Sequence, residues 1–357
     1  MAKSPQITNG IVNTEETPTE IKASGAGSAG AGRLAGDLLL STEAGLVILI
    51  VVFFIMFSAF ATGFNSPFNL FTLGRTTAVN ILIGLSMMVV IVTGGLDLSV
   101  GAIGVAAVMF SGWLMEGLHF PVPVAVIGSL GFGALLGWIN GTVIVRTGVH
   151  SFVVTLATMS IFFGTMIVLT KAESFRSLPP EFAYLAKVRW FTVVSPMLLV
   201  SVGVTAFLLY LYRWTDLGRQ MLAAGANPRA AEVSGIAVKR TFTLCHMLTG
   251  LLAALAGAML AMRNGAAIPS MAGNLGQDWL LPAFLAPVLG GTLLTGGRVS
   301  VVGTVLGAVL VTELTTGLLL LQVGEFWVQF FLGVLLLVAV LIEKARITVV
   351  TRRRKLR

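Results

Sequence analysis

Charged residues are scarce in this chain: Asp, Glu, Lys and Arg account for 11% of its 357 residues, whereas 56% are hydrophobic. A soluble protein normally has about a quarter of its residues charged, so the composition excludes an ordinary globular enzyme. It predicts instead a protein that lies in a lipid bilayer.

Cysteine and histidine are also rare, with one cysteine, Cys245, and three histidines, His119, His150 and His246. A single cysteine excludes both a disulfide framework within the chain and a zinc cluster built on cysteines. No carboxylate or third nitrogen is adjacent in sequence to His246, so we expect a packing or surface residue there and not a metal ligand. We expect no bound metal.

Sequence motifs for catalysis are missing as well. No Gly-Lys-Ser or Gly-Lys-Thr occurs, so the chain lacks the P-loop that holds ATP phosphates and magnesium. An intramembrane hydrolase is an alternative class, but no His-Glu-x-x-His zinc motif is present, and only one aspartate, Asp97, lies near a span, so a two-aspartate catalyst cannot be assembled from one chain. We therefore expect no enzyme activity and no cofactor in this chain.

Ten apolar stretches are long enough to cross a bilayer. A helix needs about 20 mainly apolar residues for this, because each residue advances about 1.5 Å along the axis. The stretches cover residues 44–61, 76–95, 98–115, 122–145, 152–170, 191–211, 241–262, 279–295, 299–321 and 326–342. They predict an all-α polytopic membrane protein with about ten transmembrane helices. The tight linkers after the second and eighth stretches are compatible with broken or re-entrant segments.

The distribution of Lys and Arg predicts the orientation, because short basic loops stay on the cytoplasmic side. With both termini inside, six of the 23 Lys and Arg residues lie outside: Arg75, Lys171, Arg176, Lys187, Arg189 and Arg263. We then expect a flexible cytoplasmic tail at 1–43, a transmembrane domain at 44–342 with a cytoplasmic loop at 212–240, and a basic cytoplasmic tail at 343–357. The net charge of +8 is spread between apolar runs, which favours contact with anionic lipid over nucleic acid.

Glycine is abundant, with 41 residues, and recurs at small-residue spacing in Gly131, Gly133 and Gly137 and in Gly303 and Gly307. Small residues let helix backbones approach closely in lipid. We therefore expect close helix packing at these positions and not direct contact with a substrate.

The predicted cytoplasmic loop has the local chemistry of a short helix. Asn227 can cap its first amides, Pro228 suits its first position, and Gly235 can adopt the left-handed conformation that ends it. A two-turn helix is marginal alone and is stabilised by docking, and the pair Ala230-Ala231 leaves a low surface that a partner's groove can accept. A plain amphipathic connector between two spans is the alternative interpretation.

The loop resembles the coupling motif of permease subunits in binding-protein-dependent ABC importers of the ribose, xylose and arabinose type. The matching positions are Gly218, Ala223, Gly225, Asn227, Ala230, Ala231, Ser234, Gly235 and Ile236. Two further blocks are similar and occur in the same order. They are residues 94–101, with Asn80 upstream, and the glycine-rich residues 290–292, 296–298, 303–304 and 307–308. Together the resemblance covers residues 44–342.

The chain departs from that family pattern before the second glycine-rich block. Relatives usually carry an acidic, alanine-rich run there, whereas this chain has Gln277-Asp278-Trp279-Leu280-Leu281-Pro282 and then Pro287. The change lies at the outer side and the start of the eighth stretch, so it bears on the cargo and not on the class of transporter.

The resemblance implies a permease subunit of an ABC importer in the bacterial inner membrane, which moves a monosaccharide or sugar alcohol inward by alternating access. It implies three protein partners: a cytoplasmic ATP-binding subunit that carries ATP and magnesium, a periplasmic sugar-binding protein, and a second permease copy, identical or homologous. The residues that it implies in coupling to the ATPase are Gly218, Ala223, Gly225, Asn227, Pro228, Ala230, Ala231, Ser234 and Gly235.

Polar side chains in or beside the spans are candidates for the translocation pathway, because burying a charge is costly unless it is paired or hydrated. These candidates are Asn80, Asp97, Asn140 and Glu313. Asp97 can instead cap the following helix through the amides of Ser99 or Val100. Glu313 can line a polar cavity, hydrogen-bond between helices or stay protonated, and the two asparagines can join neighbouring helices.

A secondary transporter driven by protons or sodium is the main alternative function. Such a protein usually carries several acids or paired polar residues at mid-membrane. Here Glu313 is nearly alone, so the sequence favours the importer subunit.

Overall fold

The computed structural model describes residues 42–190 and 193–355 of the chain, with side chains described between residues 43 and 341. The predicted N-terminal tail, apart from its last two residues, lies outside the described part. The side chains of the predicted basic C-terminal tail lie outside it as well.

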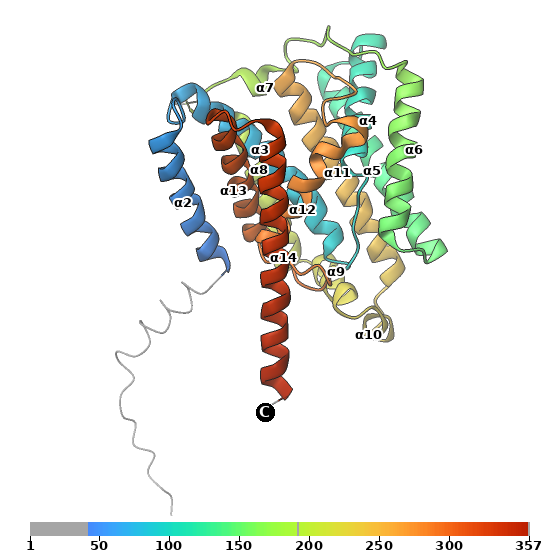
Figure 1. Ribbon diagram of the computed structural model, residues 1–357. Coiled ribbons are helices and arrows are strands. Elements are labelled where there is room, and N and C mark those ends of the chain that lie inside the picture. The colour runs from blue at the N-terminus through green and yellow to red at the C-terminus, as the bar shows by residue number, and fades with distance from the viewer. Residues whose placement is uncertain (1–41, 191–192, 356–357) are drawn as a thin grey trace, which may run out of the picture. The chain divides into compact units, whose positions relative to one another are not determined.

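The regular elements of the described residues are helices, without a strand (Figure 1). In chain order they are α2 (Thr42–Phe60), α3 (Pro67–Ile91), α4 (Val100–Gly112), the π-helical turn η1 (Trp113–Gly117), α5 (Val122–Thr147), α6 (Ser151–Thr170), α7 (Tyr184–Lys187), α8 (Pro196–Trp214), α9 (Asp216–Ala226), α10 (Pro228–Val233), α11 (Val238–Asn264), the 3-10 turn η2 (Asn274–Trp279), α12 (Leu280–Leu289), α13 (Val301–Leu320) and α14 (Glu325–Lys355).

Eight helices in the described part are long and apolar enough to cross a membrane: α2, α3, α4 with η1, α5, α6, α8, α11 and α13. The apolar part of α14, Glu325–Leu341, is shorter, and α12 has only 10 residues. Each of the ten apolar stretches in the sequence overlaps one of these helices. The predicted all-α polytopic fold is therefore confirmed.

Helix ends follow the local chemistry of the chain. Ser66, Ser195 and Ser300 precede α3, α8 and α13, and each side chain accepts a hydrogen bond from a backbone N–H of the first turn. Gly148 and Gly265 end α5 and α11 in the left-handed conformation. These caps fix where the long apolar helices start and stop.

The centre of the helix bundle is formed by α3, α4 and α11. Every residue of α3 from Thr77 to Ile91 is buried except Asn80. Most of α4 and the second half of α11 are buried too, whereas α2 exposes most of its apolar side chains. Because exposed apolar surface on this scale suits lipid and not water, α2 is a peripheral, lipid-facing helix.

Helices α5 and α11 pack backbone against backbone. A Cβ added to Gly137 would lie 2.1 Å from the carbonyl oxygen of His246, and one added to Gly250 would lie 2.2 Å from that of Gly133. The expected close packing is confirmed at Gly133 and Gly137. It was wrong for Gly131, where an added Cβ would have no neighbour within 4 Å. Gly131 is two residues from Gly133, about 200° around the helix, so it faces away from α11.

Helix α13 packs against α12 in the same way. A Cβ added to Gly303 would lie 2.1 Å from the carbonyl oxygen of Gly290, and one added to Gly307 would lie 2.3 Å from that of Ala286. The expected close packing is therefore confirmed at these two glycines as well.

Two tight linkers in the sequence correspond to non-helical segments. Residues 92–99 connect the end of α3 to the start of α4 without a regular helix, and residues 290–300 connect α12 to α13 (Figure 1). The turn η2 meets the start of α4, because an added Cβ at Gly101 would lie 2.1 Å from the carbonyl oxygen of Gly276. The side chain of Trp279 packs beside it, against Gly104.

Candidate functional site

The segment between α8 and α11 folds into two short helices, α9 and α10, at the end of the bundle where α3 ends (Figure 1). Thr215 caps α9, and Asn227 both ends α9 and caps α10. The side-chain oxygen of Asn227 accepts a hydrogen bond from the N–H of Ala230 at 3.1 Å. Pro228 is the first residue of α10. Gly235, two residues after the end of the helix, has a φ of 84°. The helix, its cap and its left-handed end agree with the local prediction from sequence.

The two alanines of α10 face in different directions. Ala231 is buried against Ala224 and Val238 of the same chain, whereas Ala230 is exposed. The expected surface made of both alanines was therefore wrong for Ala231, because successive helical residues point about 100° apart. Val233, three residues after Ala230, is 91% exposed and shares its side of the helix. Ala230 and Val233 form what we call the α10 face.

Val233 is not among the site residues that the motif identifies. The sequence could have revealed it, because Val233 is an apolar residue three positions after Ala230 in an otherwise polar loop, and residues at this spacing share one side of a helix. Val233 and Ala230 together give α10 a small exposed apolar side.

Other candidate coupling residues hold the two short helices in place. A Cβ added to Gly218 would lie 2.1 Å from the carbonyl oxygen of Leu211, so α9 lies directly against the end of α8. Ala223 is half-buried. Ser234 is exposed, and its hydroxyl donates a hydrogen bond to the carbonyl oxygen of Ala230 at 2.9 Å.

Three glycine-rich segments that are far apart in the sequence meet at one point. The N–H of Gly297 donates a hydrogen bond to the carbonyl oxygen of Val92 at 2.9 Å. A Cβ added to Gly225 would lie 1.8 Å from that same oxygen, and one added to Gly296 would lie 2.6 Å from the backbone nitrogen of Gly94. We call Val92, Gly94, Gly225, Gly296 and Gly297 the glycine junction. It connects the end of α9 to the two non-helical segments of the membrane domain.

The two candidate pathway asparagines are engaged in contacts between elements. Asn80 of α3 donates its side-chain N–H to the hydroxyl of Thr312 in α13 at 2.8 Å. Asn140 of α5 donates to the hydroxyl of Ser99 at 2.7 Å. Of the two uses open to these amides, the structure shows hydrogen bonding between elements.

Glu313 of α13 is buried, and neither carboxylate oxygen has a hydrogen-bond partner among the described residues. Of the three possibilities for this side chain, a hydrogen bond to a neighbouring helix is therefore not observed. A carboxyl group that is buried without a partner is costly in its charged form. Lining of a polar cavity and a protonated state remain compatible with this position.

Asp97 lies in the non-helical segment before α4 and is fully buried. Its Oδ1 accepts hydrogen bonds from the N–H of Ser99 at 2.9 Å and from the Ser99 hydroxyl at 2.5 Å, so the predicted contact with the Ser99 amide is confirmed. Its Oδ2 lies 3.2 Å from Nδ1 of His246 in α11.

Of the two positions expected for His246, packing or surface, the structure shows a packed one, because its side chain is only 2% exposed. The carboxylate that contacts it is 149 residues away in the sequence, which is why no local pattern reveals the pair. No cluster of three or more His, Cys, Asp and Glu side chains that could hold a metal ion is found in the described part of the chain.

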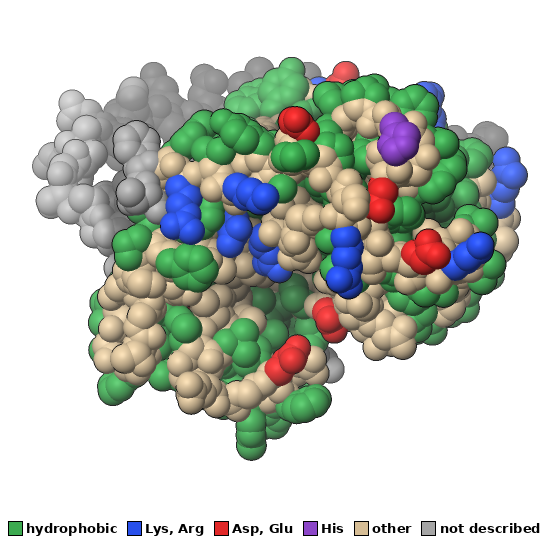
Figure 2. Space-filling view, turned by 90° about the horizontal axis from the view of Figure 1, so that it is seen from above, with side chains coloured by type: hydrophobic (Ala, Val, Ile, Leu, Met, Phe, Trp, Pro, Cys, Tyr) green, Lys and Arg blue, Asp and Glu red, His purple; other side chains and the backbone are tan. Residues whose placement is uncertain are grey.

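The opposite end of the bundle carries a group of arginines from different elements. Arg75 of α3 donates to the carbonyl oxygen of Ala186 at 3.3 Å, and Arg263 of α11 donates to a hydroxyl of α3 at 3.0 Å. The guanidinium groups of Arg75 and Arg189 lie 4.6 and 4.7 Å from the centre of the Phe71 ring. None of the three arginines forms an ion pair with a described carboxylate. Figure 2 shows Lys and Arg side chains gathered on this face.

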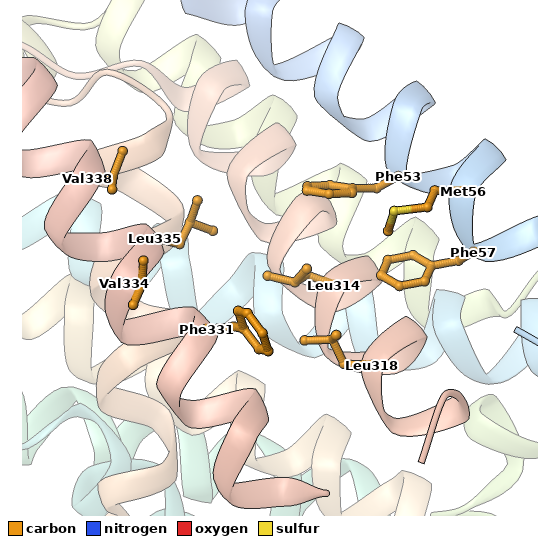
Figure 3. A pocket seen from close by; sticks show the side chains of 9 residues that line it. All are labelled: Phe53, Met56, Phe57, Leu314, Leu318, Phe331, Val334, Leu335 and Val338. Carbon is orange, nitrogen blue, oxygen red and sulfur yellow. The ribbon is translucent and has the colours of Figure 1, made fainter. Parts of the chain in front are cut away.

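A cavity of about 340 Å³ lies between α2, α13 and α14 (Figure 3). Its lining residues are Phe53, Met56, Phe57, Leu314, Leu318, Phe331, Val334, Leu335 and Val338. All of these side chains are apolar, so the cavity offers no hydrogen-bonding group to a hydroxylated solute. It is therefore not a candidate site for a polar cargo.

Comparison with known proteins identifies the family. The family described as branched-chain amino acid transport system, permease component, matches residues 69–340. The ribose import permease of Bacillus subtilis (strain 168) is 36% identical over 304 residues, which cover 85% of this chain and 91% of that protein. The fructose import permease of Rhizobium meliloti is 32% identical over 308 residues, 84% of each chain.

A further relative is the autoinducer 2 import system permease of Salmonella paratyphi B (strain ATCC BAA-1250 / SPB7), which is 35% identical over 266 residues, 72% of this chain and 78% of that protein. No solved structure matches the chain significantly. The family match includes all three segments of the glycine junction. The chain therefore belongs to this permease family and is a multi-pass permease subunit of an ABC importer.

Proposed function

We propose that the protein is the inner-membrane permease that carries a monosaccharide or sugar alcohol inward, while a separate subunit hydrolyses ATP. Relatives that share a third of their residues with this chain, over most of its length, are import permeases for ribose and fructose. The side-chain N–H groups of the asparagines of α3 and α5 are engaged in contacts within the chain, whereas Oδ1 of Asn140 and the carboxylate of Glu313 have no hydrogen-bond partner among the described residues. Because so few polar groups are free to select the cargo, we assign its selection to a separate binding protein.

The α10 face is the proposed docking site for the ATP-binding subunit, which brings ATP and magnesium. Ala230 and Val233 are exposed on one side of a capped two-turn helix, whose other side packs against its own chain at Ala231. A shallow groove on the partner can take up such a helix and bury Val233. In this proposal α9 and α10 lie in the cytoplasm, together with both chain termini.

The arginine group at the other end of the bundle is the proposed outer surface. Arg75, Arg189 and Arg263 supply positive charge without a carboxylate partner in the described part of the chain. A periplasmic sugar-binding protein with acidic residues at its rim would be attracted to this surface. A second permease copy, identical or homologous, completes the translocation pathway in this proposal.

The glycine junction is the observation that carries the coupling function. At Gly225 the backbone of α9 contacts the backbone of Val92, and Gly297 is hydrogen-bonded to the same carbonyl. A shift of α9 and α10, imposed by the ATP-binding subunit, would reach the membrane segments through backbone contacts alone. Closely packed backbone cannot absorb such a shift by changing rotamers, so it passes the motion on.

Uptake by proteoliposomes tests this function. The permease is reconstituted with its ATP-binding subunit and binding protein, and uptake is measured for labelled pentoses, hexoses and polyols. We expect uptake of at least one of these solutes that requires ATP and both partners. Uptake by the permease alone that collapses with a proton or sodium gradient would overturn the proposal in favour of a secondary transporter.

A further inference from the structure

The non-helical segment 92–99 is held by hydroxyl groups of α6. The N–H of Leu96 donates a hydrogen bond to the hydroxyl oxygen of Ser151 at 3.0 Å, and the N–H of Leu98 donates to that of Thr155 at 3.1 Å. Backbone amides that have no helical partner inside a membrane protein must find other acceptors. Two hydroxyls at i and i+4 on one face of α6 provide them.

A buried side-chain network holds the other end of the same segment. Asn140 of α5 donates to the Ser99 hydroxyl, which donates to Asp97, and Asp97 meets His246 of α11. Asp97, Ser99 and Asn140 are completely buried, and His246 is 2% exposed. The network therefore ties segment 92–99 to two long helices, α5 and α11, away from any solvent.

Packing alone does not explain an acid and an imidazole at this place. A buried pair of this kind is often no more stabilising than apolar side chains of similar volume, because both groups lose their hydration. Its advantage is directional, since the hydrogen bonds fix one arrangement of the segment relative to α11. The helices α5 and α11 are themselves in backbone contact where His246 lies, at Gly137. A displacement of His246 would therefore move a rigid pair of helices.

The same segment begins at the glycine junction, where α9 contacts Val92. Segment 92–99 is thus in contact with the proposed coupling helices at one end, and it is held by the pair of Asp97 and His246 at the other. An extended segment fixed at one end only would bend and absorb the motion. A segment that is fixed at both ends transmits it.

We propose that Asp97 and His246 are positioning residues that couple ATP hydrolysis to transport, by tying segment 92–99 to α11 so that movement of α9 reaches the centre of the bundle. This inference rests on the proposed function of α9 and α10 as the site where the ATP-binding subunit acts. It assigns a role to two residues that contact neither the nucleotide nor the docking surface.

The test compares variants in the full complex in proteoliposomes, using the sugar that the wild-type complex transports. The measured quantity is the number of ATP molecules hydrolysed per sugar molecule taken up. In His246→Leu the carboxylate loses its partner in α11, and we expect this ratio to rise about tenfold, within the range of typical coupling between sites. In His246→Asn an amide N–H occupies nearly the position of Nδ1, and we expect a ratio close to that of the wild type.

Two further variants separate coupling from folding. Thr249→Val removes a buried hydrogen bond to the Ser86 carbonyl, one turn from His246 on α11 and outside the network, so it should keep the wild-type ratio. The double variant Asp97→Asn with His246→Leu leaves no unpaired buried charge, and it decides the question if His246→Leu does not assemble. We expect this double variant to assemble and still to show the raised ratio.

The outcomes distinguish the two proposals. A wild-type ratio in the assembled double variant would overturn the positioning role while leaving the importer function intact. A raised ratio in Thr249→Val equal to that of His246→Leu would also overturn it, because any buried hydrogen bond of α11 would then have the same effect. If the wild-type complex shows no ATP-dependent uptake, the proposed function itself fails.

Discussion

Gly225 in α9 and Val92 at the end of α3 are in direct backbone contact, and a Cβ on the glycine would lie 1.8 Å from the Val92 carbonyl oxygen. That oxygen already accepts a hydrogen bond from Gly297. One carbonyl group thus joins the loop helices, the end of α3 and the turn before α13. There is no room for a methyl group on Gly225, so a substitution to alanine tests the contact.

Gly225→Ala should therefore separate α9 from α3. Overpacking of this kind costs about 1–3 kcal/mol, so we expect a lower melting temperature together with loss of ATP-driven uptake. Gly203→Ala in α8 is the matched control, because an added Cβ there has no neighbour within 4 Å. Uptake by Gly225→Ala at the wild-type rate would show that the contact does not transmit motion.

Val233→Asp tests the α10 face. The side chain is almost fully exposed, so the change should alter the free energy of unfolding by no more than about 0.5 kcal/mol. We expect it to abolish co-purification with the ATP-binding subunit, since a carboxylate would have to be buried in the interface. Ala230→Trp should have the same effect for steric reasons. Normal assembly of both variants would exclude this face as the docking site.

Ala231→Trp should behave differently from Ala230→Trp. Ala231 is packed against Ala224 and Val238, so a large side chain must displace α10 from its own chain. We expect a lower melting temperature for the permease on its own, before any partner is added, with a cost of about 1–3 kcal/mol. Equal melting temperatures for the two tryptophan variants would contradict the burial of Ala231.

Glu313→Gln tests the unpaired carboxyl group in α13. If the carboxyl group is ionised, its replacement by an uncharged amide of nearly the same shape should raise the melting temperature of the permease, by the equivalent of about 1–3 kcal/mol. If the group is already protonated, the melting temperature should stay the same. If the carboxyl group lines the translocation pathway, sugar uptake should fall in the same preparation. Unchanged uptake would remove Glu313 from the pathway, and a lower melting temperature would show that the carboxyl group has a partner.

Arg189→Glu tests the outer surface. Reversal of one exposed charge in the arginine group should weaken association with the binding protein about tenfold at low ionic strength, and less at high salt. Lys171→Glu, at the end of α6, is the control for a general effect of charge. Equal effects of the two reversals would argue against a specific role of the arginine group.

Hydropathy and capping chemistry were sufficient to predict the long apolar helices and the shape of α10, but not the helix α9 beside it. Apolar runs of about 20 residues have few alternatives to a helix in lipid, and Asn227, Pro228 and Gly235 each act on their nearest neighbours in sequence. Such short-range effects can be seen in a single sequence. Close packing between helices could be predicted from the spacing of small residues. The spacing does not show which glycines face a neighbouring helix, and Gly131 does not.

The contacts between distant segments could not be predicted in this way. Asp97 and His246 are separated by 149 residues, and the hydropathy of their surroundings gives no sign of the pair. The burial of Ala231 depends on how α9 and α11 are placed, and not on the motif that contains it. The three glycine-rich segments resemble family motifs one by one, but only the fold shows that they meet.

The most direct test is sugar uptake by proteoliposomes that contain the permease and its binding protein, measured with and without the ATP-binding subunit at saturating ATP. We predict uptake only when that subunit is present, and none when Val233→Asp permease replaces the wild type at the same inserted amount. Uptake without the subunit, or undiminished uptake by the Val233→Asp complex, would contradict the proposal that motion enters this permease through α9 and α10.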